Sequence, residues 1–201
     1  MNPITHGLSG WVLGSVLDLD RRDRGLVTLA ALAPDLDGAG LLIDLARAGT
    51  EGPRELWEAY HHVGAHNLSF ALVLTGIALG LGHRRWLTAA LTFVMVHLHL
   101  LEDLIGSRGP DGFQWPIHYL MPFERSLALT WEGQWALNAW PNIALTALLI
   151  GASGYYGWRQ GWTFIGLVWQ RADAIVVKAL RQRFGEPSGV QGDDLIGGPG
   201  T

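Results

Sequence analysis

The chain has 201 residues, a length that fits one domain and can bury a core. Hydrophobic residues make up 49% and charged residues only 16%, a composition that favours residence in a membrane over solution. The formal net charge of -4 and the lack of a basic stripe argue against nucleic acid as a main ligand.

The first half of the chain predicts two helical hairpins. The apolar stretches Gly7 to Leu17 and Gly25 to Ala33 flank a polar turn. Each is short for a full span, because a membrane helix needs about 20 apolar residues. Leu68 to Leu81 and Trp86 to Leu98 form a stronger, transmembrane hairpin. The polar connection between the two hairpins, Ala46 to Tyr60, is expected to lie outside the hydrocarbon.

The second half predicts a rim, a further span and a surface segment. Gly106 to Glu132 is rich in glycine, proline and aromatic residues, which argues against a continuous helix and favours an ordered lid or rim. Trp140 to Gly157 is another expected span, and Trp162 to Phe184 becomes amphipathic, as membrane-surface helices are. The fold prediction is an all-α, multi-helix integral membrane bundle built from helical hairpins. It comprises a single domain over residues 1–184 and a disordered tail over residues 185–201.

Candidate metal ligands and basic residues occupy opposite ends of the predicted hairpins. Arginines follow the first apolar stretch, and others lie in the turn of the transmembrane hairpin. Two successive hairpins would therefore bring all the candidate metal ligands to one side. Basic residues concentrate on the cytoplasmic side of membrane proteins. The sequence thus predicts a multi-pass protein with its metal site near the outer face.

Spacing selects the ligands within each histidine cluster. His99 and Asp103 are four residues apart, which places both on one helical face, and His62 and His66 repeat that spacing. His61 lies about 100° from His62 on a helix, so one of the two is expected to support the other ligands rather than bind. Periodicity favours His62 as the ligand and leaves His61 as the candidate catalytic histidine. His97 points away from this face.

Two aspartates and one loop provide further candidates with competing interpretations. Asp35 and Asp37 follow a proline and could bind one cation each or bridge two, although helix capping is the commoner role for such residues. The rim carries Arg108, Trp115 and His118, which are the candidate substrate-binding residues. An arginine there could bind phosphate or carboxylate oxygens, or could equally anchor at the lipid headgroups. Glu102 is assigned to the solvated surface.

The ligand types indicate which metal and which chemistry to expect. No cysteine is present, so a metal must be bound by nitrogen and oxygen. Mixed histidine and carboxylate ligands suit zinc first, as one or two ions, with manganese or iron possible. Ionisable groups at a membrane are costly and are functional candidates by default. A metal-activated water near neutral pH would make the chemistry hydrolysis.

The sequence resembles the membrane-bound metal-dependent hydrolases, also described as the LexA-binding, inner-membrane-associated hydrolase family. The residues that carry the resemblance are Thr5-His6, Pro34-Asp35-Leu36-Asp37, His66-Asn67 and His99-Leu100-Leu101-Glu102-Asp103. The resemblance implies an inner-membrane hydrolase and a ligand role for His6, Asp35, Asp37, His66, His99 and Asp103. The sequence departs from the family pattern at Val63 and Asn67, so the assignment of the preceding histidine pair stays open.

Two functions follow as hypotheses. The first is a membrane-embedded metal-dependent hydrolase that acts on a phosphoester or lipid-like substrate, with membrane lipid and a small-molecule or lipid-like substrate as its partners. The alternative is a non-catalytic, metal-stabilised membrane protein with a regulatory or interaction role. Metal transport is disfavoured, because a transport path needs ligands at several depths, whereas these cluster at one end.

Overall fold

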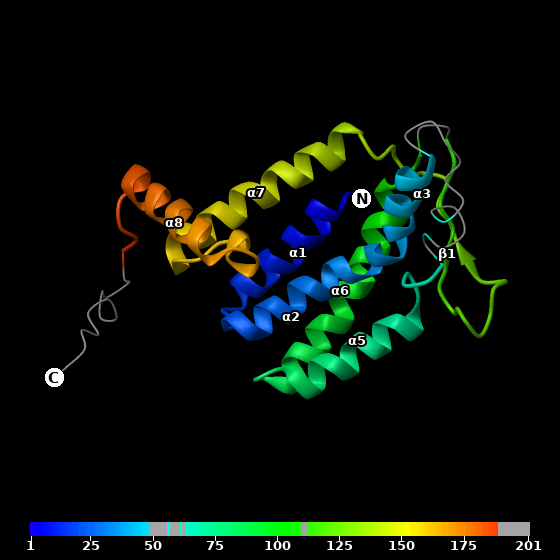
Figure 1. Ribbon diagram of the computed structural model, residues 1–201, viewed down its shortest axis with the longest axis horizontal. Coiled ribbons are helices and arrows are strands. Elements are labelled where there is room, and N and C mark those ends of the chain that lie inside the picture. Colours follow the sequence, from blue (N-terminus) through cyan, green and yellow to red (C-terminus); the bar gives the residue numbers. More distant parts are fainter. Residues whose placement is uncertain (49–55, 57–60, 62, 110–111, 189–201) are drawn as a thin grey trace. The chain divides into compact units, whose positions relative to one another are not determined.

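The computed structural model describes residues 1–48, 56, 61, 63–109 and 112–188 (Figure 1). Most of the predicted polar connection and of the predicted tail lies outside these residues. The chain forms two compact units, Met1–Ile150 and Gly151–Thr201, and each is considered by itself. The described part is mostly helical, as predicted, with one short pair of strands.

The first unit begins with two antiparallel helices, α1 (Pro3–Val16) and α2 (Arg21–Leu32). The side chain of Asn2 caps α1 by accepting the N–H of Thr5, and Asp20 caps α2. These caps satisfy backbone donors that would otherwise lack partners, so each helix has a defined start.

Beyond α2 the structure differs from the predicted break. The chain continues through a 3-10 helix, η1 (Ala33–Ala39), into α3 (Gly40–Ala48). Pro34 sits at the start of η1, where its missing N–H costs nothing, so it tightens the helix instead of ending it. The helical run Arg21–Arg47 thereby reaches 27 residues, long and apolar enough to cross a membrane.

The second hairpin consists of α5 (Leu68–Leu81) and α6 (Arg85–Gly106). At 22 residues, α6 is the other helix of membrane-spanning length and composition in the described part of the chain. Its partner α5 has 14 residues and is apolar but shorter than a full span. The predicted span at Trp140 to Gly157 does form a helix, α7 (Trp140–Gln160), which is not among the two candidates.

Small apolar side chains hold α2 between its neighbours. One buried cluster joins Val27 and Ala31 of α2 to Met95 of α6 and to Leu19 of the α1–α2 turn. A second cluster joins the other side of α2 to both α5 and α6; it contains Ala30, Ala71 and Val96. Packing on both sides sets the positions of α2 and α6 relative to each other, and with them the residues at their ends.

The turns of the two hairpins lie side by side. The buried carboxylate of Asp23 accepts the backbone N–H groups of His83 and Arg84 at 2.7 and 2.9 Å. The exposed ring of His83 also bonds the carboxylate of Asp20 at 2.9 Å. Joining these turns places the opposite ends of α1, α2 and α6 together, which is the arrangement that the hairpin argument predicted.

The rim after α6 contains little regular structure. Its strands β1 (Ile117–His118) and β2 (Ala128–Leu129) pair antiparallel. The carbonyl of Tyr119 accepts the N–H of Leu68 at 2.8 Å, so the rim is bonded to the start of α5. The predicted absence of a continuous helix here is what the structure has.

The second unit contains the end of α7, the 3-10 helix η2 (Phe164–Leu167) and α8 (Gln170–Phe184). The buried carboxylate of Asp173 accepts both the N–H and the hydroxyl of Thr163 at 2.7 Å, which fastens α8 to the segment before η2. The indole N–H of Trp158, near the end of α7, donates to the carbonyl of Gly185, the residue that follows α8. This bond connects the ends of the two helices.

Candidate metal centre

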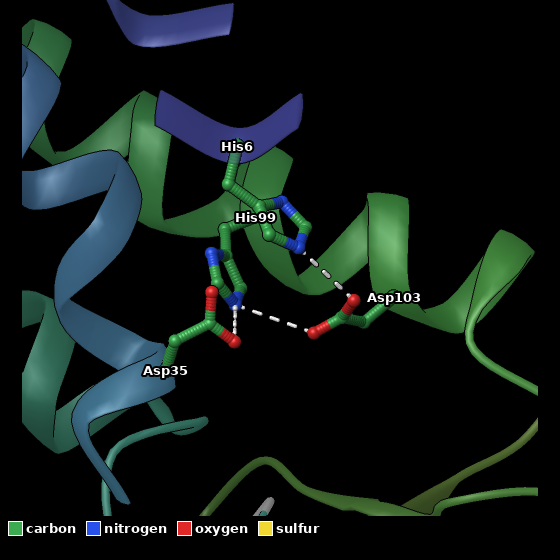
Figure 2. A group of neighbouring side chains, drawn as sticks. All are labelled: His6, Asp35, His99 and Asp103. Carbon is green, nitrogen blue, oxygen red and sulfur yellow. Dashed lines mark hydrogen bonds and ion pairs between the residues drawn. The ribbon is translucent and has the colours of Figure 1, made fainter. Parts of the chain in front are cut away.

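Four side chains from three elements meet at the ends of the helices (Figure 2). His6 comes from α1, Asp35 from η1, and His99 and Asp103 from α6. One ligand atom from each lies within 4.8 Å of all the others. The i and i+4 spacing on α6 puts His99 and Asp103 on one face, as predicted, and their atoms Nε2 and Oδ2 are 3.2 Å apart.

The ring of His99 has a determined tautomer. Its Nδ1 lies 2.7 Å from the backbone carbonyl of Ala31, an oxygen that can only accept a hydrogen bond. Nδ1 must therefore carry the proton. In the neutral ring Nε2 then has a lone pair, and this atom faces Asp35 and Asp103 at 3.8 and 3.2 Å.

The ring of His6 is held in the same manner by a carboxylate. Its Nδ1 lies 2.6 Å from Oε2 of Glu102, and its Nε2 lies 3.2 Å from Oδ1 of Asp103. The hydroxyl of Ser9 donates to the other oxygen of Glu102 at 2.7 Å. Glu102 is only 7% exposed, so its assignment to the solvated surface was wrong. Its position three residues after His99 is the signal that could have placed it beside the site.

A third ring, that of His66, joins the group from the segment before α5. Its Nδ1 lies 2.9 Å from Asp37, and its Nε2 lies 3.1 Å from Nε2 of His99 and 3.3 Å from Asp103. The Asp37 oxygen that faces His66 also accepts the backbone N–H of Ala65 at 3.0 Å. Burial lowers the pKa of His66, so its ring is neutral over a wider pH range than an exposed histidine.

This donor set fits a metal ion. With Nδ1 protonated on both rings, the Nε2 lone pairs of His66 and His99 face each other at 3.1 Å, a contact that is favourable only around a shared cation or proton. Nitrogens bound to one zinc ion at about 2.0–2.1 Å lie about that far apart. Asp35 contributes a second signal, because its buried Oδ2 has no hydrogen-bond partner in the described part of the chain.

The α-amino group of Met1 also reaches this cluster. It donates to Oδ1 of Asp103, the oxygen that faces His6. Burial lowers the pKa of the Met1 amino group to about 5, so at neutral pH the group is predominantly an uncharged amine. Asp103 is thus the carboxylate on which the largest number of the site's nitrogen atoms converge.

The remaining predicted ligands occupy different places. Asp37 lies in η1 and bonds His61 at 3.2 Å as well as His66, so it holds rings and is not one of the four clustered groups. The carboxylate of Asp37, three residues before the start of α3 at Gly40, bonds His61, His66 and the backbone N–H of Ala65. His62 lies outside the described residues. The ring of His61, the candidate catalytic histidine, packs edge-on against Trp115 at 5.6 Å.

The candidate substrate-binding residues are divided by the structure. Trp115 is the one beside the histidine cluster, through its contact with His61. Arg108 donates to the carbonyl of Glu132, within the rim. His118 lies in β1 and bonds the carbonyl of Arg125 at 3.1 Å at the surface. His97, which the spacing set aside, bonds Tyr119 of the rim at 2.8 Å and has no place in the cluster.

A comparison with protein families matches residues 1–178 to the family described as YdjM inner membrane protein. The chain belongs to the YdjM inner membrane protein family. The match covers α1 through most of α8, including every residue of the cluster. Membership supports the inner membrane as the location, in agreement with the two membrane-length helices of this YdjM family member. No curated protein and no solved structure shows significant similarity to it.

Proposed function

We propose that the chain is a membrane-embedded, metal-dependent hydrolase that acts on a phosphoester or lipid-like substrate. In this proposal the helices form a multi-pass integral bundle with the metal centre near the outer face. The observation that carries the proposal is the common orientation of the three histidine rings. His6, His66 and His99 each have Nδ1 bonded to an acceptor and Nε2 turned toward Asp103.

Such an arrangement is typical of metal centres in proteins. Metal-binding histidines usually donate their second N–H to a carboxylate or a carbonyl, which fixes the ring and raises its basicity. Here Glu102, Asp37 and the carbonyl of Ala31 supply those three acceptors. A bundle that needed only polar contacts between helices would not require all three rings to turn Nε2 toward one carboxylate.

The residues present would hold one ion, with zinc favoured by mixed nitrogen and oxygen ligands. The nitrogens of His6, His66 and His99 and the carboxylates of Asp35 and Asp103 are the proposed ligands. When bound, the ion would supply a water of lowered pKa and a positive charge for a phosphoryl or acyl oxygen. His61 would act as the proton acceptor of the site through its Nε2, and Asp37, at 3.2 Å from its Nδ1, would hold the ring for this role.

The alternative is a non-catalytic protein in which the ion only stabilises the bundle. Burial of the ligands favours it: His6, His66 and His99 are all essentially inaccessible. A catalytic centre keeps one position open to water and substrate, whereas a structural one is closed. Asp35, with a side chain 19% exposed, is the least buried of the proposed ligands, and this supports the catalytic proposal.

Elemental analysis of the purified full-length protein tests the centre. We expect a transition metal, most abundantly zinc, in the wild type and a large loss of it in His99→Ala and Asp103→Ala. His83→Ala is the matched control, because His83 lies exposed in the turn that joins α5 to α6 and bonds Asp20 at the start of α2, away from the cluster. Correctly folded wild-type protein without any transition metal would overturn the proposal.

Activity separates the two functions. The wild type, the two ligand variants and His61→Ala are assayed on phosphodiester, phosphomonoester and lipid ester substrates in detergent micelles. Hydrolysis that the control retains and the three variants lose supports the hydrolase. Metal that is bound stoichiometrically, with no substrate turned over in a variant-sensitive manner, establishes the metal-stabilised alternative.

A further inference from the structure

The second unit contains an apolar groove that the metal centre does not use. It measures about 480 Å³, within the range of sites that hold small apolar ligands. The end of α7 forms one wall and the end of α8 the other. Its lining residues are Gly151, Gly154, Tyr155, Trp158, Leu180 and Phe184. We propose that this groove holds one acyl chain of an anionic phospholipid.

The glycines keep the groove open. A Cβ added to Gly151 or Gly154 would have no neighbouring atom within 4 Å. Glycine is unfavourable inside a helix, so neither packing nor helix propensity accounts for these two residues. Elsewhere in the same unit, an added Cβ at Gly157 would lie 2.5 Å from the side chain of Thr163, so the helix packs closely just beyond the groove.

The walls are apolar but exposed. Phe184 is 68% and Tyr155 is 49% exposed, which leaves large apolar surface in contact with the medium. Leu180 and Phe184 are four residues apart and lie on the same face of α8 as the buried Val177. A hydrocarbon chain between α7 and α8 would continue the apolar contact that Val177 begins.

Charge identifies the headgroup. Residues 151–188 contain five basic and two acidic residues, whereas the whole chain has a net charge of -4. Both acidic side chains already have partners: Asp173 bonds Thr163, and Glu186 pairs with Arg181 at 3.6 Å. The exposed Lys178 and Arg183 therefore present positive charge on α8, the helix that forms one wall of the groove, and anionic headgroups are attracted to such charge.

Photolabelling of the full-length protein tests the proposal. The protein is placed in vesicles of phosphatidylcholine and phosphatidylglycerol that contain phosphatidylglycerol with a diazirine in one acyl chain. After illumination and digestion, we expect lipid adducts on peptides with residues 151–158 and 180–184. Unlabelled phosphatidylglycerol in excess should reduce these adducts more strongly than unlabelled phosphatidylcholine.

Filling the groove provides the decisive variant. Gly154→Leu puts an isobutyl group into open space, so the fold should tolerate the substitution. Lipid labelling of both walls of the groove should fall several-fold. Gly151→Leu is a second variant with the same expected result. Gly80→Leu is the control, because Gly80 in α5 is equally open but lies outside the groove. Lys178→Gln with Arg183→Gln should remove the preference for phosphatidylglycerol and keep the groove itself.

Three results would overturn the proposal. Labelling of the walls that Gly154→Leu and Gly151→Leu leave unchanged would show general exposure to lipid. Equal labelling by a diazirine phosphatidylcholine would remove the role of the anionic headgroup. Chemical cross-links that join the groove to residues 1–150 or to a second copy, in place of lipid adducts, would identify protein as the occupant.

Discussion

At the residue scale, the candidate metal centre depends on side chains outside the four clustered groups. Glu102 accepts from His6 at 2.6 Å and Asp37 from His66 at 2.9 Å, and each carboxylate has a further donor that holds it in place. Rings fixed in this way need little reorganisation to present Nε2 to an ion. Part of the metal affinity should therefore lie in these carboxylates.

Glu102→Gln tests this expectation. The amide is the same size but carries no charge and holds the ring of His6 less firmly. We expect the affinity for zinc to fall by roughly 10–100-fold, as is usual for such supporting groups. Competition with a chelator of known affinity measures the change in purified protein. Glu124→Gln, at an exposed position of the rim, should leave the affinity unchanged. Equal zinc affinities for the wild type, Glu102→Gln and Glu124→Gln would mean that packing alone orients His6.

At the scale of elements, the close approach of α1 and α2 positions His6. Gly10 lies one helical turn after His6, and a Cβ there would be 2.9 Å from Cβ of Ala31 and 3.0 Å from Cα of Thr28. Gly14 repeats the contact four residues later, against Arg24. Small residues at this spacing let helix backbones approach closely, as in many membrane helix pairs.

Gly10→Ala should therefore destabilise the protein by about 1–3 kcal/mol, because the neighbours include backbone atoms that cannot move aside. Gly80→Ala introduces the same methyl group into open space on α5 and should be neutral or slightly stabilising. Thermal unfolding in detergent, followed by tryptophan fluorescence, compares the two with the wild type. A midpoint for Gly10→Ala at or above that of Gly80→Ala would contradict the close packing.

At the scale of the whole molecule, the orientation of the helices in the membrane decides which compartment the centre faces. In the first unit, basic residues flank both hairpin turns, and the cluster lies at the other ends of the helices. Retention of basic residues on the cytoplasmic side would direct the cluster outward. The 22 residues of α6 are long enough to connect the two sides.

Reporter fusions test this topology. A reporter inserted after Arg85, at the start of α6, should report the cytoplasm, and one inserted after Arg108, just past its end, the opposite side. Each fusion is paired with a periplasmic and a cytoplasmic reporter, so that a silent fusion is recognised. Detection of both positions in one compartment would show that α6 does not cross the membrane.

Much of the candidate site was predictable because its residues follow short-range patterns along the chain. His99 and Asp103 share a helical face by periodicity alone, and apolar stretches between polar turns indicate hairpins that bring distant ends together. The continuity of α2 into α3 was not predictable in this way. A proline ends most helices, and its placement at the start of a 3-10 turn depends on packing against neighbouring elements.

The sequence by itself determined the helical character, the apolar composition and the histidines and aspartates that meet at the ends of the helices. The tertiary structure alone decided which groups each of them contacts. The partners of Nδ1 on His6 and His99 lie 96 and 68 residues away in the chain, so no local pattern specifies them. Packing of α1 and α2 on α6 buries Glu102 beside His6 and turns the Nε2 atoms of His6 and His99 toward Asp103, because ring orientation follows from contacts between elements.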